Sequence, residues 1–319
     1  MMVLVTGGAG FLGSHLVEAL VKEGARVRVL DNLSTGKLEN LAGLPVEFIE
    51  GDIADRETVQ TAVSGCSLIF HQAALVSVPL SIKEPLHNHL SNVNGTFNVF
   101  DAARDCGVRR VVYASSAAVY GNLPKLPKQE SDSLAPITPY AAAKQMSEIM
   151  AGAYTASYGV EMVGLRYMNI FGPRQDPSSP YSGVLSIFCR RAMQGQDVTI
   201  FGDGEQTRDF VYVGDVVQAN LRAAQASVLK LVNGETPTAV FNVGRGEQTS
   251  LNQIVDALRQ ITGHDIPVNY GTEREGDIKH SYADISRARN ILGYQPQTSI
   301  LDGLRETLAW FEESERVLA

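Results

Sequence analysis

A tyrosine and a lysine four positions apart, Tyr140 and Lys144, are the residues of this sequence best suited to proton transfer. Thr138 and Pro139 directly before them are typical of a helix start, with threonine as N-cap and proline in the first turn. Residues four apart share one face of a helix. A lysine ammonium beside a phenol favours the phenolate, so we expect the pKa of Tyr140 to fall from about 10 toward neutral pH. The pair could then take a proton from a substrate alcohol and return it.

The Tyr-x-x-x-Lys spacing is also common on ordinary amphipathic helices, so its interpretation depends on the surrounding residues. Residues 108–114 are expected to form a strand, and Ser115 and Ser116 follow directly. Ligands of parallel α/β sheets bind outside the carboxyl ends of the strands, so these hydroxyls should face a cleft. Either serine could therefore place a hydroxyl beside the tyrosine and lysine.

Three glycines near the start of the chain, Gly7, Gly10 and Gly13, follow an apolar run at residues 2–5 and precede an amphipathic pattern that ends near Gly24. A strand, a glycine-rich turn and a helix form the phosphate-binding corner of a dinucleotide fold. The helix N-terminus there offers free N–H groups and a partial positive charge. Glycine triplets also occur by chance in loops, so the spacing alone leaves a structural turn open.

An acidic residue at the end of the next expected strand makes the dinucleotide interpretation specific. Asp31 closes residues 26–30, roughly twenty residues beyond the glycines. There a carboxylate accepts hydrogen bonds from the hydroxyls of an adenosine ribose. Asn32 follows it, and no basic side chain is in place for a 2′-phosphate. The sequence therefore favours NAD over NADP, and hydride leaving a substrate alcohol would pass to the nicotinamide.

Strands alternate with helices through the first half of the chain, and this predicts a parallel sheet. Further strands are expected at 46–50 and 67–70. We predict an α/β fold with a doubly wound parallel Rossmann sheet and a smaller C-terminal mixed α/β substrate domain. The expected boundaries are 1–170 and 171–319, with segments at about 209–245 returning to the first domain. Residues beyond two of the strand ends would contact the cofactor: Asp52, Ile53, Gln72, Ala73 and Ala74.

The composition excludes several other classes of protein. The chain has 319 residues, 44% of them hydrophobic, and a formal net charge of 27 − 35 = −8 without a block of like charges, so we expect no nucleic-acid partner. Three scattered cysteines form neither a metal motif nor a disulfide framework and fit a reducing compartment. Without a basic leader or an apolar run of about 20 residues, the protein is expected to be cytoplasmic, with no membrane contact.

The ordered set of glycine turn, Ser-Ser-x-x-Val-Tyr-Gly and Tyr-x-x-x-Lys resembles the extended short-chain dehydrogenase/reductase family, and within it the nucleotide-sugar C4-epimerases. The resemblance covers essentially the whole chain. It implies NAD as cofactor, a UDP-sugar as substrate, Tyr140 as acid/base with Lys144 and Ser116 beside it, and a homodimer built from helices near 92–105 and 139–158.

The resemblance also implies further contact residues. For NAD these are Phe11, Leu12, Asn32, Ser34, Gly36, Asn92, Ser115 and Tyr167. For the substrate they are Val78, Asn169, Arg208, Arg274 and Asp277, with the two arginines on phosphate oxygens, which a planar guanidinium bonds bidentately.

Two alternatives remain open beside an epimerase. A related 4,6-dehydratase or decarboxylase needs a further acid next to the catalytic serine, where this chain has Ala117 and Ala118. A non-catalytic NAD-binding regulator typically lacks the tyrosine or the lysine.

A small residue at one position favours an N-acetylated sugar. An ungapped match of residues 274–277 and 283–286 to the family places Ser281 where relatives restricted to glucose and galactose carry tyrosine. A serine leaves room beside C2 of the sugar, so we expect UDP-GlcNAc and UDP-GalNAc as substrates, and UDP-Glc and UDP-Gal as well.

Overall fold

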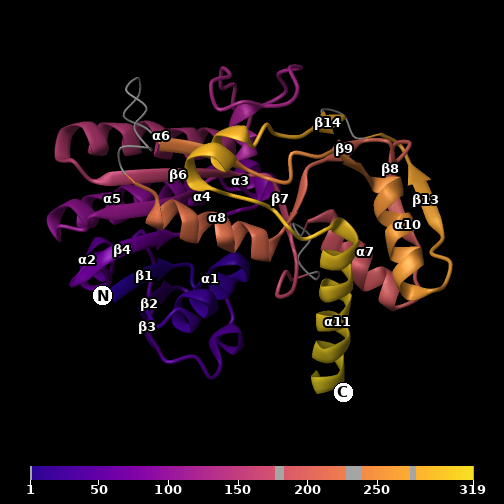
Figure 1. Ribbon diagram of the computed structural model, residues 1–319, viewed down its shortest axis with the longest axis horizontal. Helices are drawn as coiled ribbons and strands as arrows, with labels where there is room; N and C mark the ends of the chain where they lie inside the picture. The colour runs from indigo at the N-terminus through magenta and orange to yellow at the C-terminus, as the bar shows by residue number, and fades with distance from the viewer. Residues whose placement is uncertain (1, 177–182, 228–238, 274–277, 319) are drawn as a thin grey trace.

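The main sheet of the computed structural model is parallel and has seven strands in the order β11-β6-β5-β4-β1-β2-β3 (Figure 1). The structure describes residues 2–176, 183–227, 239–273 and 278–318. The strands are β1 (Met2–Thr6), β2 (Arg26–Asp31), β3 (Val46–Glu50), β4 (Cys66–His71), β5 (Arg110–Ser116), β6 (Glu161–Tyr167) and β11 (Ala239–Val243). The chain moves outward from β1 to β3 and then returns to β4, so the order reverses between β1 and β4. The predicted doubly wound sheet is confirmed.

Helices cover both faces of this sheet because successive strand residues point to opposite sides. Val3 and Val5 pack with α1 (Phe11–Lys22) and α8 (Val213–Gln225). Leu4 between them packs into a second cluster with the helices of the other face. Those helices are α2 (Arg56–Val63), α5 (Gly95–Asp105) and α6 (Pro139–Tyr158).

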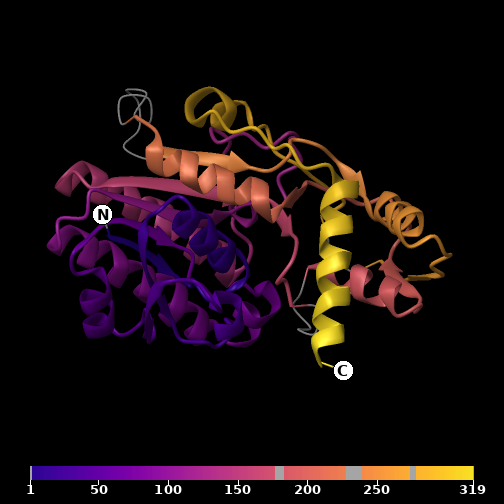
Figure 2. The same ribbon diagram turned by 60° about the horizontal axis from the view of Figure 1, so that its bottom comes forward.

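A smaller apolar cluster forms beside the main sheet and is built mostly by the second half of the chain. It joins α7 (Val184–Met193), β8 (Val198–Phe201), α10 (Leu251–Thr262) and α11 (Ile300–Leu318). The long α11 stands beside α7 and α10 (Figure 2). The other short elements are β7 (Asn169–Phe171), β9 (Thr207–Arg208), β10 (Phe210–Tyr212), β12 (Thr249–Ser250), β13 (Val268–Gly271), β14 (His280–Ser281) and η4 (Ala288–Leu292).

The connection between β4 and α5 is irregular where it borders the carboxyl edge of the sheet. It comprises α3 (Val78–Lys83), α4 (Pro85–Asn88) and the π-helical turn η2 (His89–Asn94). In that turn, Asn92 binds the backbone of Leu75 at both its N–H (2.8 Å) and its carbonyl (2.9 Å). Single π turns inside helices occur frequently at functional sites. No helix within the described ranges is both long and apolar enough to cross a membrane.

A buried histidine links β4 to its neighbours. The two ring nitrogens of His71 lie 2.8 Å from the Thr6 hydroxyl on β1 and 3.0 Å from the Thr96 hydroxyl on α5. Burial, and secondarily the charge of Lys144, lowers the pKa of His71 from 6.5 to about 3. His71 therefore stays neutral in the folded protein across the physiological range.

This lowered pKa predicts a loss of stability in acid. Below about pH 6.5 the unfolded chain binds a proton at His71 that the folded chain does not accept until about pH 3. The free energy of unfolding is therefore at its full value above about pH 6.5 and falls as the pH drops. At pH 5 the loss is about 2 kcal/mol. Urea unfolding from pH 4.5 to 8 should show this slope, and His71→Gln should flatten it. The same substitution at the exposed His264 should not, and an unchanged slope in His71→Gln would contradict the assignment.

Candidate active site and cofactor site

Ser116, Tyr140 and Lys144 meet at the carboxyl end of β5. Thr138 caps α6 by accepting a hydrogen bond from the N–H of Ala141 (3.2 Å), which fixes the turn that carries Tyr140. The Lys144 ammonium lies 5.8 Å from the centre of the Tyr140 ring and donates to the carbonyl of Ala114 (2.9 Å). The structure therefore brings together the three residues proposed for proton transfer.

The expected fall of the tyrosine pKa is wrong for the protein by itself. Tyr140 is only 8% exposed, and its burial raises the pKa of the phenol, while its hydrogen bond with the Ser116 hydroxyl opposes that rise. Lys144 donates to a backbone carbonyl, and its own burial lowers its pKa from 10.5 to about 8. Desolvation, which disfavours both charged forms, outweighs the attraction between ammonium and phenolate.

A buried ion pair fixes the helix that carries the tyrosine and lysine. Glu148, one turn beyond Lys144 on α6, receives two hydrogen bonds from Arg166 on β6, at 2.9 and 2.7 Å. The same carboxylate accepts from the hydroxyl of Ser115 (2.5 Å). The Ser115 hydroxyl is therefore directed into this buried pair and holds α6 against β5, so the expectation that it faces a cleft is wrong.

The glycine turn is packed so closely that side chains are excluded. A Cβ on Gly7, whose φ is +69°, would come within 2.7 Å of the backbone nitrogen of Ala73. A Cβ on Gly13 would come within 2.0 Å of the Gly7 carbonyl oxygen. Gly10 is the N-cap of α1 and makes no side-chain cap, and the described residues place no acceptor on the N–H groups of Phe11 or Leu12. This open helix start fits a pyrophosphate.

Asp31 lies directly beside the glycine turn. Its carboxylate accepts from the N–H groups of Ala9 and Leu33, each at 2.9 Å. A Cβ on Gly36 would come within 2.8 Å of the same carboxylate, so this glycine keeps the loop close to it. Each carboxylate oxygen accepts more than one hydrogen bond, so both can still receive ribose hydroxyls. The residues present therefore fit the adenosine half of a dinucleotide.

Two neighbouring polar residues form a rim next to Asp31. Asn32 donates to the carboxylate of Asp52 (2.8 Å) and accepts from the N–H of Ser34 (3.0 Å). Ile53, beside Asp52, is buried against Gly95.

Two of the remaining residues proposed for NAD, Tyr167 and Gln72, are joined by side-chain hydrogen bonds. The hydroxyl of Tyr167 lies 3.2 Å from the side-chain oxygen of Gln72 and 3.0 Å from that of Asn220 on α8. Gln72 also donates to Asn220 (3.1 Å). Ala73 and Ala74 follow Gln72 and are half-buried. Asn92, as described above, holds the backbone of Leu75, so its amide supports this loop. Asn220 was missed from the sequence, because no spacing links α8 to β6.

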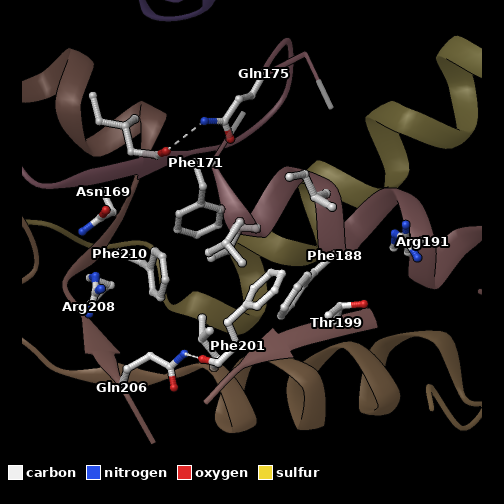
Figure 3. Close-up of a pocket in the computed structure, with 16 residues that line it drawn as sticks. Asn169, Phe171, Gln175, Phe188, Arg191, Thr199, Phe201, Gln206, Arg208 and Phe210 are labelled. Atoms are coloured by element: carbon white, nitrogen blue, oxygen red, sulfur yellow. Dashed lines mark hydrogen bonds between the residues drawn. The ribbon is translucent and has the colours of Figure 1, made fainter. Parts of the chain in front are cut away.

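A separate cavity of about 700 Å³ lies between β7, α7 and β8 and contains two of the proposed substrate residues, Asn169 and Arg208 (Figure 3). Aromatic side chains line much of it, among them Phe188, Phe201 and Phe210. Ser116, Tyr140 and Lys144 do not line this cavity. The lining of this cavity suits a planar ring and phosphate oxygens.

Ser281 is placed next to one of the cavity residues. It pairs with Arg208 in the parallel register of β14 and β9, and the carbonyl of the next residue, Tyr282, accepts from the N–H of Lys128 (2.9 Å). Val78 begins α3 and is half-buried. Arg274 and Asp277 lie outside the described residues.

Asp209 is a further residue that sequence reasoning missed, although it stands within the Arg208-Asp209-Phe210 segment. It is fully buried and accepts from the N–H groups of Arg245 (2.7 Å), Gly246 (3.0 Å) and Ala283 (3.4 Å). Burial raises its pKa from 3.8 to about 6. Asp209 thus ties the end of β11 and the segment after Ser281 to Arg208. An aspartate next to an arginine gave no sign of these distant partners.

The described part of the chain holds no cluster of three or more His, Cys, Asp or Glu side chains arranged for a metal ion.

A doubly wound sheet with this glycine turn and this serine, tyrosine and lysine defines an extended short-chain dehydrogenase/reductase. The model of the NAD dependent epimerase/dehydratase family matches residues 3–244, and the chain belongs to that family, whose cofactor is NAD.

Several solved structures have the same fold as this protein over nearly its whole length. UDP-glucose 4-epimerase from Thermotoga maritima, solved with UDP-glucose, has a TM-score of 0.92 and 38% identity, covering 99% of this chain and 100% of that one. UDP-N-acetylglucosamine 4-epimerase from Methanobrevibacter ruminantium, in complex with UDP-N-acetylmuramic acid, has a TM-score of 0.91 and 38% identity, covering 98% of each chain. A UDP-N-acetyl-alpha-D-glucosaminuronate decarboxylase from Bacillus cytotoxicus is 33% identical over 98% of both chains.

Proposed function

We propose that this protein is a UDP-sugar 4-epimerase that inverts C4 through a transient 4-keto sugar. The observation that carries the proposal is the meeting of Ser116, Tyr140 and Lys144 at the sheet edge. Tyr140 takes the proton of the C4 hydroxyl and later returns it, while Ser116 binds the same oxygen. NAD held at the glycine turn and Asp31 would supply the hydride chemistry at C4, and the positive charge of its oxidised ring would favour the phenolate.

The cavity residues would hold the nucleotide while the sugar turns. Arg208 and Asn169 suit the phosphate oxygens, and the aromatic side chains suit a base. Only the sugar then has to rotate between the two hydride transfers. Oxidation and reduction would both act on one bound sugar, so the reaction would consume no NAD.

The two alternative functions, a dehydratase or decarboxylase and a regulator that only binds NAD, fit the residues of the site less well. A dehydratase or decarboxylase reaction needs an acid beside Ser116, but η3 (Ala117–Tyr120) supplies alanines there. Because one relative is a decarboxylase, the alternative is tested by assaying release of CO₂ from a UDP-uronic acid. A regulator that only binds NAD has no need for Lys144, whose burial with a lowered pKa is costly.

Tyr140→Phe should lower epimerisation about 10²–10⁴-fold, because the variant loses the group that moves the proton. UDP-sugar and NAD binding should stay nearly unchanged, since the ring is kept. NMR of UDP-glucose and UDP-GlcNAc without added cofactor measures turnover, and calorimetry measures binding. Tyr158→Phe at the exposed end of the same helix is the control. Activity of Tyr140→Phe within a few-fold of wild type would assign the proton to another group.

For the sugar, we propose that UDP-GlcNAc and UDP-GalNAc are substrates in addition to UDP-Glc and UDP-Gal. The support is the small side chain of Ser281 on β14, directly beside Arg208. The Methanobrevibacter relative is named for the N-acetylated sugar and the Thermotoga relative for glucose, so kinship alone does not choose between them.

Ser281→Tyr should lower turnover of the N-acetylated pair at least tenfold and spare the plain hexoses. A bulky ring in the space of the acetyl group overpacks the site, which typically costs about 1–3 kcal/mol. His280→Tyr is the matched control, because adjacent strand residues face opposite sides. The kcat/KM ratio of the two substrate pairs is the readout. An equal loss on both pairs, or none, would remove Ser281 from the pocket wall.

A second copy of the chain is the partner we propose. Large apolar side chains are exposed along neighbouring helices on one side of the molecule: Leu86 (69%) and Phe97 (41%) at α4–α5, and Met146 (44%) and Ile149 (65%) on α6. Homodimer interfaces have such an apolar core, and a symmetric pair would cover the same patch on both copies.

Replacing Ile149 with Glu should convert the dimer into a monomer, because an unpaired charge would be buried at its centre. Sedimentation at micromolar concentration measures the mass directly. Leu38→Glu, at an exposed leucine in η1 (Leu38–Leu41), should leave the mass unchanged. A monomeric wild type would contradict the proposal.

A further inference from the structure

A short segment after β7, residues 172–176, crosses onto the helix that begins the dinucleotide site. The carbonyl of Pro173 accepts from the ring of His15 (2.9 Å). Arg174 donates to the hydroxyl of Ser14 (3.3 Å) and to the carboxylate of Glu18 (2.7 Å). All three partners are on α1, within two turns of the open N–H groups of Phe11 and Leu12.

The same segment reaches the opposite wall of that site. Asp176 lies 3.7 Å from the ammonium of Lys37, in the loop that follows Asp31. The N–H of Lys37 in turn donates to the carbonyl of Ala9 in the glycine turn (3.0 Å). Residues 172–176 therefore connect the wall built by α1 with the wall built by the loop after β2.

Arg174 adopts a backbone conformation that is unusual for its type. Its φ is +68°, in the left-handed region that few non-glycine residues occupy. Such a conformation persists only where surrounding contacts hold it, and it is found frequently at ligand clamps. Here the contacts are those to Ser14 and Glu18.

The next residue faces the other half of the site. Gln175 lines the 700 Å³ cavity and donates to the carbonyl of Ile170 (3.2 Å) (Figure 3). One short segment thus touches both the candidate dinucleotide site and the candidate nucleotide cavity.

We propose that residues 172–176 form a clasp that slows the release of bound NAD, with Arg174 as its principal contact. The inference rests on the placement of NAD between the glycine turn and the Asp31 loop, as in the proposed function. The clasp joins the two walls that flank the proposed adenosine position, so it should resist their separation when NAD leaves. A cofactor that is regenerated in every cycle has no need to leave, so slow release suits this reaction.

The experiment measures the rate of NAD release from the purified protein. The protein is diluted into an excess of the fluorescent etheno analogue of NAD, and exchange is followed over time. Arg174→Ala and Arg174→Gly should both release NAD at least tenfold faster than wild type. Alanine removes the contacts and keeps the strained backbone, whereas glycine removes both, so a similar effect of the two assigns it to the side chain. Arg305→Ala, which removes an exposed pair with Asp302 on α11, should release at the wild-type rate.

A charge exchange separates a clasp from a general loss of stability. In Glu18→Arg combined with Arg174→Glu the ion pair is restored with reversed signs, and slow release should return at least in part. Melting temperatures measured after removal of NAD should differ little among these variants. The proposal is overturned if wild type itself releases NAD rapidly, if both Arg174 variants stay within twofold of wild type, or if release follows the melting temperature. Epimerisation is assayed separately, so an inactive protein with slow, Arg174-dependent release would refute the proposed reaction and not the clasp.

Discussion

The buried pair of Glu148 and Arg166 is the interaction on which the geometry of the active site depends. It joins the helix of Tyr140 and Lys144 to β6, and through Ser115 to β5. Arg166 continues to the hydroxyl of Tyr120 (2.9 Å), which donates to Asn242 on β11 (2.7 Å). Breaking such a pair leaves an uncompensated buried charge, at a cost of about 3–5 kcal/mol. One network thus sets the register of the helix relative to three strands.

The two halves of the site follow different physical rules. Around Tyr140 and Lys144, burial shifts each pKa against its charged form, so the protein by itself does not prepare a phenolate. Around the glycine turn and Asp31, backbone N–H groups and a solvated rim favour charged and polar ligand groups. In the proposed reaction, the positive ring charge of bound NAD would add to that of Lys144 in favouring the phenolate. The serine, tyrosine and lysine lie apart from the 700 Å³ cavity, which they do not line.

Much of the fold could be predicted because local rules and global topology agree here. The bounds of α6 follow from Thr138, Pro139 and Gly159, and its C-terminal glycine has the left-handed conformation expected there. Strands β2 and β3 begin and end near the expected residues. The π turn at Asn92 could not be foreseen, because it depends on the distant backbone of Leu75. The lowered pKa expected for Tyr140 failed for a similar reason, since the degree of burial is a property of the packed structure.

The sequence by itself determined the doubly wound class, the glycine turn and the preference for NAD, and it singled out the tyrosine and lysine as candidates for proton transfer. These features follow from residue types that lie close together in the chain, and the local conformation of such segments can be predicted from the sequence. Only the tertiary structure decided the contacts of Asp209, Asn220 and Arg174, and the place of Ser281 beside Arg208. Their partners lie tens to more than a hundred residues away in the chain. Such contacts arise only when the sheet and its connections have closed, so no local spacing records them.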